Sequence, residues 1–210
     1  MLLNLLEKFI VPQGITHISG PPNSGKTTIL YQTCKGIKNG KKVLILDCET
    51  NFSAQRLQEI ILDSGIKLEN VTVISLLDKK QQLKTVMKVQ NFLGNSNYQF
   101  IAINGITDHF RFSKIEQEEK ELPKTLNLQL AFLRMISYEY EIPILLTNQV
   151  TAFKGVKGST LRPIAESSFR NYVDNEVSLI HINKKLWKAS HKNEEEYYTI
   201  TDRGIKVIKS

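Results

Sequence analysis

The feature that most constrains this chain is the segment from residue 20 to residue 27, which reads GPPNSGKT. It matches the pattern G-x-x-x-x-G-K-[ST] at every fixed position, and a chance match is expected in roughly one chain of this length in a hundred. A strand-like run over residues 15–19 precedes it, and a helical pattern over 27–39 follows it. In this order, the N–H groups of a tight loop and the positive end of a helix face a phosphate group.

Each fixed position of the motif has a chemical reason. Gly20 and Gly25 allow backbone conformations and a close approach that a Cβ atom would prevent. Lys26 can neutralise the β- and γ-phosphates, and the hydroxyl of Thr27 is placed to ligate Mg²⁺. A glycine-containing turn with an exposed lysine is the alternative. The motif predicts a site for ATP and Mg²⁺ with nucleotide contacts at Gly20, Pro21, Pro22, Asn23, Ser24, Gly25, Lys26, Thr27 and Thr28.

The rest of the chain alternates between strand-like and helix-like patterns, as parallel βα units do. Further strands are predicted at 42–47, 71–75, 100–103 and 144–146, and short strands with polar turns follow after residue 177. Helices are predicted from a cap at Ser53 to Gly65, from a cap at Asp78 to Leu93, and over 122–140. We therefore expect an α/β fold with a mostly parallel central sheet, flanking helices and an antiparallel C-terminal extension.

Composition narrows the class of protein. The 210 residues suffice for one full-sized domain, and we expect 1–210 to form a single core. Lys and Arg number 28 against 21 Asp and Glu, and this net charge of +7 permits a polyanionic partner. No apolar run reaches the roughly 18 residues of a membrane helix, and the opening segment is too short for a secretory signal. We expect no membrane partner and a cytoplasmic location.

The two cysteines and four histidines do not indicate a second kind of site. Cys34 and Cys48 lie in apolar surroundings without C-x-x-C spacing, so we interpret both as small buried residues. The histidines are scattered and lack metal-ligand spacing. Neither a disulfide framework nor a zinc site is predicted.

Polar residues follow three of the predicted parallel strands. Glu49 comes just after the strand at 42–47, where a carboxylate can orient an attacking water. Asn104 comes at the end of the strand at 100–103. Gln149 comes after the strand at 144–146, at the end of the strand where a polar group can sense a γ-phosphate. These positions favour a nucleotide-hydrolysing protein among the classes that share the phosphate loop.

Five segments follow one another along the chain: the phosphate loop, LDCETNF at 46–52, HFR at 109–111, LTNQV at 146–150 and YTITDRGI at 198–205. With these segments in this order, the chain resembles the RecA/RadA family of recombinase ATPases, and most closely archaeal RadA paralogs of the RadB or RadC kind. The resemblance covers nearly the whole chain and implies a RecA-like P-loop NTPase fold. It implies that Lys26 and Thr27 contact phosphate and metal, and that Glu49 and Gln149 are catalytic, as the base that orients water and as the sensor.

The chain also departs from the family pattern. Asn104 stands where the family's Walker B strand ends in Asp. An amide oxygen can still accept from a metal-bound water but adds no charge, so we expect a weak metal contact at Asn104 and slow ATP hydrolysis. Only about a dozen residues precede the first strand, which implies a core without the family's N-terminal DNA-binding domain and little filament formation by this chain alone.

Two segments correspond to the family's DNA-facing loops. The first is short and rich in Glu between 116 and 121, which suits a phosphate backbone poorly. The second, residues 152–163, has the composition of a mobile loop that binds single-stranded DNA. Its candidate contacts are Phe153, Lys154, Lys157 and Arg162. An ordinary basic surface loop is the alternative. We interpret Trp187, near the C-terminus, as a core residue of an edge strand with solvated lysines around it.

The sequence thus predicts an ATP-binding recombinase paralog that assists homologous recombination and DNA repair, with hydrolysis that is weak or modulated by DNA. The expected partners are single-stranded DNA and a full-length RadA-like recombinase, and self-association is left open. One alternative is a regulatory interaction module with a vestigial nucleotide site, which Asn104 favours and the intact phosphate loop opposes. Another is a small-molecule kinase, although the chain has no Arg-rich lid of the kind such enzymes use.

Overall fold

A central sheet organises the molecule. The computed structural model describes residues 10–38, 40–94, 97–110, 116–155 and 158–208. Within these ranges a ten-stranded sheet has the order β10-β9-β8-β7-β1-β5-β4-β2-β3, and β6 pairs with β5 beside this path. The strands are β1 (Gly14–Gly20), β2 (Lys42–Asp47), β3 (Val71–Ser75), β4 (Tyr98–Asn104), β5 (Pro143–Gly155), β6 (Gly158–Pro163), β7 (Asn175–His181), β8 (Trp187–His191), β9 (Glu194–Thr201) and β10 (Gly204–Ile208).

The middle of the sheet is parallel, as the sequence predicts. The pairs β1–β5, β5–β4, β4–β2 and β2–β3 are all parallel. Their apolar runs, such as Val43–Leu46 and Ile101–Ile103, are buried because helices cover both faces. In the shared register, Gly20 lies beside Gln149 and Asp47 lies beside Asn104. The carboxyl ends of these strands therefore meet along one edge, where the predicted site residues are placed.

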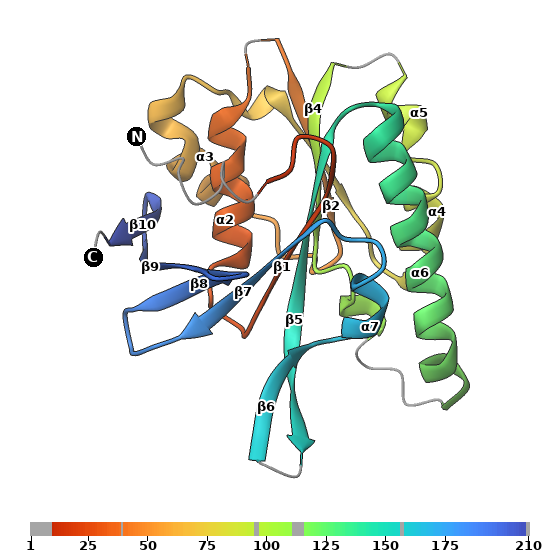
Figure 1. Cartoon of the computed structure of the whole chain (residues 1–210). Coiled ribbons are helices and arrows are strands. Elements are labelled where there is room, and N and C mark those ends of the chain that lie inside the picture. Colours follow the sequence, from red (N-terminus) through yellow and green to blue (C-terminus); the bar gives the residue numbers. More distant parts are fainter. Residues whose placement is uncertain (1–9, 39, 95–96, 111–115, 156–157, 209–210) are drawn as a thin grey trace.

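Two layers of helices cover the sheet (Figure 1). One face carries α2 (Lys26–Thr33) and α3 (Ala54–Ile61), and the other carries α4 (Lys79–Val86), α5 (Gln90–Leu93) and α6 (Glu116–Glu139). On α6, the helical spacing of Leu126, Leu130 and Leu133 places all three against the sheet. A short helix, α7 (Glu166–Phe169), precedes β7. None of the described helices is long and apolar enough to cross a membrane.

The helix starts predicted at Ser53 and Asp78 are confirmed, whereas the helix predicted over 122–140 begins earlier, at Glu116, and two helix ends also differ from the prediction. The side chains of Ser53 and Asp78 cap α3 and α4 by accepting from backbone N–H groups three residues later. The helix predicted over 27–39 ends at Thr33 and tightens into a 3₁₀ turn, because the buried and extended Ile37 turns the chain towards β2. The single helix predicted to reach Leu93 is divided into α4 and α5.

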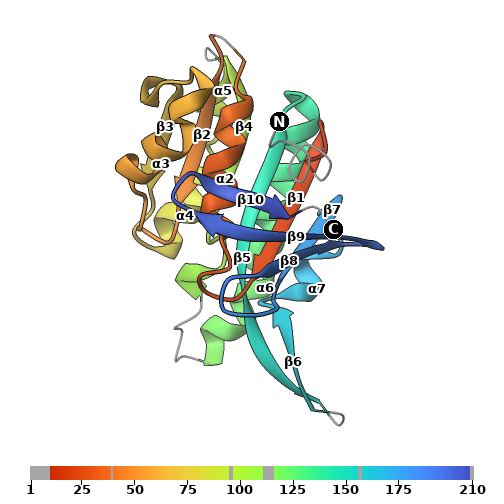
Figure 2. The same cartoon turned by 90° about the vertical axis from the view of Figure 1, so that its left-hand side faces the viewer.

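The antiparallel extension is also confirmed. β7 runs parallel to β1, whereas β7–β8, β8–β9 and β9–β10 are antiparallel pairs. Figure 2 shows β9 and β10 passing in front of α2. Tyr198 and Ile205 from these strands are buried in the same apolar cluster as Ile29 of α2. The C-terminal strands are thereby fixed beside the helix that follows the phosphate loop.

The segment predicted as a mobile loop is a β-hairpin. The strand expected to end at residue 146 continues as β5 to Gly155, and residues 158–163 return as β6 in antiparallel register. The run Val150–Phe153 has high strand propensity, which explains why pairing continues. The hairpin projects beyond the helices in both views (Figures 1 and 2). The acidic residues between 116 and 121 lie in the first turns of α6.

Candidate nucleotide-binding site

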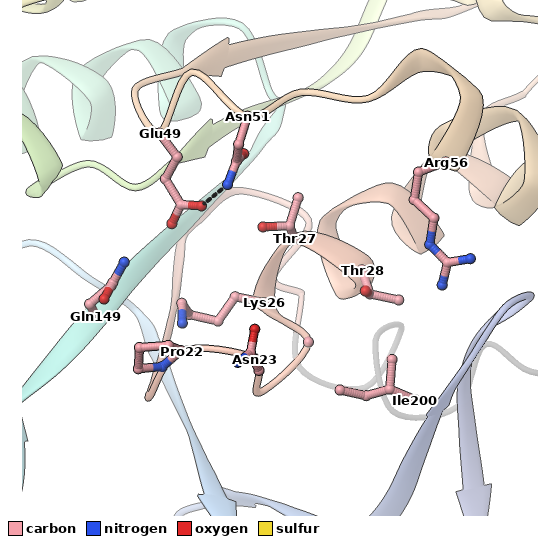
Figure 3. A pocket seen from close by; sticks show the side chains of 11 residues that line it. Pro22, Asn23, Lys26, Thr27, Thr28, Glu49, Asn51, Arg56, Gln149 and Ile200 are labelled. Carbon is pink, nitrogen blue, oxygen red and sulfur yellow. Dashed lines mark hydrogen bonds between the residues drawn. The ribbon is translucent and has the colours of Figure 1, made fainter.

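A cavity of about 530 Å³ lies at the carboxyl edge of the parallel strands. Figure 3 shows the side chains that line it. Six of the predicted nucleotide contacts line the cavity, and they come from the loop after β1 and the start of α2. Gly20, Pro21 and Ser24 are not among the lining residues. The lining residues are Pro22, Asn23, Gly25, Lys26, Thr27, Thr28, Glu49, Asn51, Arg56, Gln149 and Ile200.

The loop from Gly20 to Gly25 has a shape that requires glycine at both ends. Gly25 has a φ of 87°, in the left-handed region, and the backbone of Asn23 has a φ of 63°. A Cβ atom at Gly20 would lie 2.8 Å from the Cβ of Leu179, and one at Gly25 would lie 3.1 Å from the terminal carbon of Ile200. The left-handed backbone of Gly25 and the close neighbours of both glycines therefore agree with the two reasons predicted for glycine at these positions.

The polar atoms of the loop fit an anionic ligand. Lys26 is only 6% exposed, and its Nζ donates hydrogen bonds of 2.9 Å to the carbonyl oxygens of Gly20 and Pro21. The hydroxyl of Ser24 is buried and has no hydrogen-bond partner among the described residues. A lysine held by carbonyl oxygens of its own loop, at the lining of a cavity, is a group that a phosphate can satisfy.

A hydrogen-bond network behind the loop connects Thr27 to Asn104 and Asp47. The Thr27 hydroxyl lies 3.3 Å from Oδ1 of Asn104, which also accepts a 3.0 Å bond from Thr147. On the other side of the same amide, Nδ2 donates to Oδ1 of Asp47 at 2.9 Å. Asn104 does not line the cavity but contacts two residues that do, Thr27 and Asn51, and Oδ1 of Asn51 accepts from Nδ2 of Asn104 at 3.3 Å. Sequence reasoning missed Asp47, whose only signal is an acidic residue at the end of a buried strand.

Glu49, Gln149 and Lys26 surround one end of the cavity (Figure 3). Oε2 of Glu49 accepts a 2.7 Å hydrogen bond from the side-chain amide of Asn51. Gly105 makes room for Glu49, because a Cβ atom there would lie 2.5 Å from Cγ of Glu49. The structure thus brings both predicted catalytic residues beside the predicted phosphate contacts, and Asn51 is an addition that the sequence did not reveal.

Arg56 and Ile200 lie at the opposite end of the cavity (Figure 3). The guanidinium of Arg56, on α3, donates to the carbonyl oxygens of Thr201 and Asp202. This contact ties α3 to the end of β9, where Ile200 is located. Sequence reasoning missed both residues, because the only local signal for Arg56 is its place in the helix that follows Glu49.

The remaining candidates lie outside the cavity. Phe153 and Lys154 are on β5 and Arg162 is on β6, where it is exposed and pairs in register with Thr151. Lys157 and Arg111 lie outside the described residues. The hairpin begins directly after Gln149, whose carbonyl oxygen accepts a 3.0 Å bond from the N–H of Ile164. The candidate DNA-binding segment is therefore covalently continuous with one end of the cavity.

A phosphate loop between the first strand and helix of a mostly parallel sheet is the arrangement of the P-loop nucleotide-binding proteins. The family model described as Rad51 matches residues 2–176. The chain belongs to the Rad51 family, and the resemblance to archaeal RadA paralogs is confirmed.

Three relatives illustrate the similarity, each described as a DNA repair and recombination protein RadB. The relative from Thermococcus sibiricus is 28% identical, over 93% of this chain and 87% of its own length. The one from Thermococcus gammatolerans is 30% identical, over 92% of this chain and 90% of its own length. The one from Methanocaldococcus jannaschii is 29% identical, over 99% of this chain and 98% of its own length.

Proposed function

We propose that this chain is an ATP-binding recombinase paralog that assists homologous recombination and DNA repair and hydrolyses ATP slowly. The observation that carries the proposal is the phosphate loop, in which the buried Lys26 and the hydroxyl-bearing Thr27 line a cavity of about 530 Å³. Membership of the Rad51 family, with relatives named for DNA repair and recombination, supports the same role.

The residues of the loop have distinct tasks in nucleotide binding. Lys26 would exchange the carbonyl oxygens of Gly20 and Pro21 for phosphate oxygens, which are stronger acceptors for an ammonium group. Thr27 donates its hydroxyl proton to Asn104, which leaves the lone pairs of Oγ1 free for a metal ion. Mg²⁺, when bound there with ATP, would neutralise the charge on the phosphates.

The residues at the Glu49 end are suited to hydrolysis. Glu49 would hold and orient a water molecule, and the amide of Asn51 fixes one of its carboxylate oxygens. Gln149 ends the parallel part of β5 beside Gly20, so it is placed to respond to the terminal phosphate. Because Asn104 adds no charge at the metal side, we expect turnover to be slow.

We propose single-stranded DNA and a full-length RadA-like recombinase as partners. The β5–β6 hairpin, with its basic and aromatic residues, would carry the DNA contacts, and its attachment after Gln149 would couple them to the nucleotide. We further propose that residues 1–210 form one core domain. Measuring the molecular mass in solution would test whether the chain self-associates.

One experiment separates this function from a regulatory module that binds ATP without hydrolysing it. ATP binding and ATP hydrolysis are measured with Mg²⁺, with and without single-stranded DNA, and Glu49→Gln serves as the control for hydrolysis. We expect Mg²⁺-dependent binding and slow turnover that changes when DNA is added. Binding without turnover would favour a regulatory module that does not hydrolyse ATP, and failure to bind ATP would contradict the proposed function and favour a module whose nucleotide site is vestigial.

A further inference from the structure

We propose that Asp47 is a positioning residue for the metal side of the site, acting through the amide of Asn104. Asp47 does not line the cavity and is fully buried, and Asn104 is only 2% exposed. The three side chains Thr27, Asn104 and Asp47 form a hydrogen-bonded chain that leads away from the cavity. The inference rests on the proposed function, because it assumes that Asn104 contributes to a metal site and assigns Asp47 as the residue that orients it.

The direction of the Asn104 amide is fixed from its oxygen side by Thr147. The N–H of Gly105 donates a 2.8 Å bond to the hydroxyl oxygen of Thr147. The proton of Thr147 is therefore free to point at Oδ1 of Asn104, 3.0 Å away. Thr27 can donate to the same oxygen. An amide turned the other way would place its two N–H groups against these hydroxyl protons.

Asp47 provides the shorter of two hydrogen bonds that fix the same amide from its nitrogen side; the other, of 3.3 Å, goes to Oδ1 of Asn51. Oδ1 of Asp47 accepts from Nδ2 of Asn104 at 2.9 Å, and Oδ2 accepts from the N–H of Phe52 at 3.0 Å. The register of β2 and β4 places Asp47 directly beside Asn104, so the contact is built into the sheet. A carboxylate that accepts from an amide N–H also makes the amide oxygen a stronger acceptor, because the two hydrogen bonds polarise one another.

Asp47→Asn is the informative change because it leaves the shape almost unaltered. The N–H of Phe52 requires an acceptor, so the new amide would direct its oxygen there and its NH₂ group at Nδ2 of Asn104. Two donors would then face each other. The strain is relieved when the amide of Asn104 turns, and this brings an NH₂ group to the hydroxyl of Thr27. Thr27, on the side of the site proposed to hold the metal, would lose Oδ1 of Asn104 as its acceptor.

Adding Asn104→Asp to this variant restores the hydrogen bond between positions 47 and 104, with the donor and the acceptor exchanged. The amide at position 47 would then accept from Phe52 and donate to the new carboxylate at position 104. That carboxylate would accept from Thr27 and Thr147, as Oδ1 of Asn104 does now. In the native background, by contrast, Asn104→Asp brings two carboxyl groups into contact within a buried site, where like charges repel strongly.

The test is a double-mutant cycle on the full chain, with the wild type, both single variants and the double variant. Binding of a non-hydrolysable ATP analogue is titrated with Mg²⁺, affinity is also measured without metal, and melting temperatures are recorded. We expect Asp47→Asn to raise the Mg²⁺ concentration at half-saturation about tenfold, as the loss of one charge-assisted hydrogen bond would, while metal-free affinity is unchanged. Adding Asn104→Asp should recover most of this loss.

Asp174→Asn is the matched control, because its carboxylate also accepts from a backbone N–H, that of Ile15, and from a side chain, that of Arg134. It should lower the melting temperature without changing the Mg²⁺ dependence. The inference is overturned if Asn104→Asp has the same effect on the Mg²⁺ midpoint in both backgrounds, or if Asp47→Asn leaves that midpoint unchanged. Failure of the wild type to bind the analogue at all would instead contradict the proposed function.

Discussion

The hydroxyl of Tyr198 donates a 2.7 Å hydrogen bond to the carbonyl oxygen of Ser24, which joins strand β9 to the phosphate loop. Tyr198 is fully buried, and burial raises the pKa of its phenol, so the group stays a proton donor at neutral pH. The C-terminal strands therefore help to hold the loop in shape, although they lie far from it in the sequence.

Tyr198→Phe should remove this link and leave the buried carbonyl oxygen of Ser24 without the phenol donor. We expect a loss of about 1–3 kcal/mol in the free energy of unfolding, measured by chemical denaturation, and a smaller gain in stability when ATP is added. Tyr197→Phe is the control, because Tyr197 is an exposed neighbour on the same strand. Equal effects of the two substitutions would show that the link to Ser24 contributes nothing.

Gly105→Ala tests whether the space occupied by Glu49 matters for hydrolysis. Gly105 has a φ of 73°, and an added Cβ would lie 2.5 Å from Cγ of Glu49. We expect a loss of stability of about 1–2 kcal/mol from the backbone and a fall in turnover that exceeds the fall in ATP affinity.

Gly65→Ala provides a matched control for the backbone cost. Gly65 has a φ of 74°, and nothing lies within 4 Å of its added Cβ. It should therefore lose similar stability while turnover per folded molecule stays unchanged. The account of Glu49 is wrong if both alanine variants hydrolyse ATP at the rate of the wild type.

Glu49→Gln should separate binding from chemistry. Glutamine keeps an acceptor for the side-chain amide of Asn51 but is a far weaker base than a carboxylate. Steady-state hydrolysis should fall by about 10²- to 10⁴-fold, whereas ATP affinity should change little. Glu69→Gln, an exposed glutamate paired with Lys67, should have no effect on either quantity. A Glu49→Gln protein with normal turnover would remove Glu49 from the mechanism.

The hairpin is the predicted site of DNA binding. Replacing Lys154, Lys157 and Arg162 by Ala should weaken binding to single strands and flatten the dependence of log K on log salt. Each lost charge should reduce the slope by about 0.7, because fewer counterions are released. Fluorescence anisotropy over a series of salt concentrations measures both the affinity and the slope.

Two further variants sharpen this experiment. Phe153→Ala should cost about 1–3 kcal/mol of binding with little change in the salt slope, since base stacking releases no counterions. Lys184→Ala with Lys185→Ala, at the exposed turn between β7 and β8, is the control for net charge. If this control changed the slope and the hairpin variant did not, the basic group near Trp187 would be the DNA site.

Local patterns were sufficient where the determining interactions are local. The phosphate loop, the caps at Ser53 and Asp78 and the apolar parallel strands each depend on residues a few positions apart. The grouping of Glu49 and Gln149 near Gly20 could also be predicted, because the carboxyl ends of parallel strands share one edge. These features account for the fold class and for most of the residues that line the cavity.

The parts that the sequence did not reveal depend on which strands are neighbours. Asp47 looks like the last residue of an ordinary strand until β2 is known to lie beside β4 and its partner Asn104. Arg56 and Ile200 meet at the cavity only because β9 crosses near α2 and α3. The hairpin was expected to be a loop because its glycines and lysines outweighed the strand-forming residues before them.

The most direct test of the nucleotide site is calorimetric titration of ATP with Mg²⁺ into the wild type and into Lys26→Ala, with Lys38→Ala as an exposed control. Lys26 supplies a buried ammonium group at the loop, and a charge-assisted hydrogen bond contributes about 1.5–3 kcal/mol, or roughly tenfold to a hundredfold in affinity. We predict that the wild type and Lys38→Ala bind ATP equally well, whereas Lys26→Ala folds normally and binds ATP at least tenfold to a hundredfold more weakly. Undiminished ATP affinity in a folded Lys26→Ala protein would contradict the assignment of the phosphate loop.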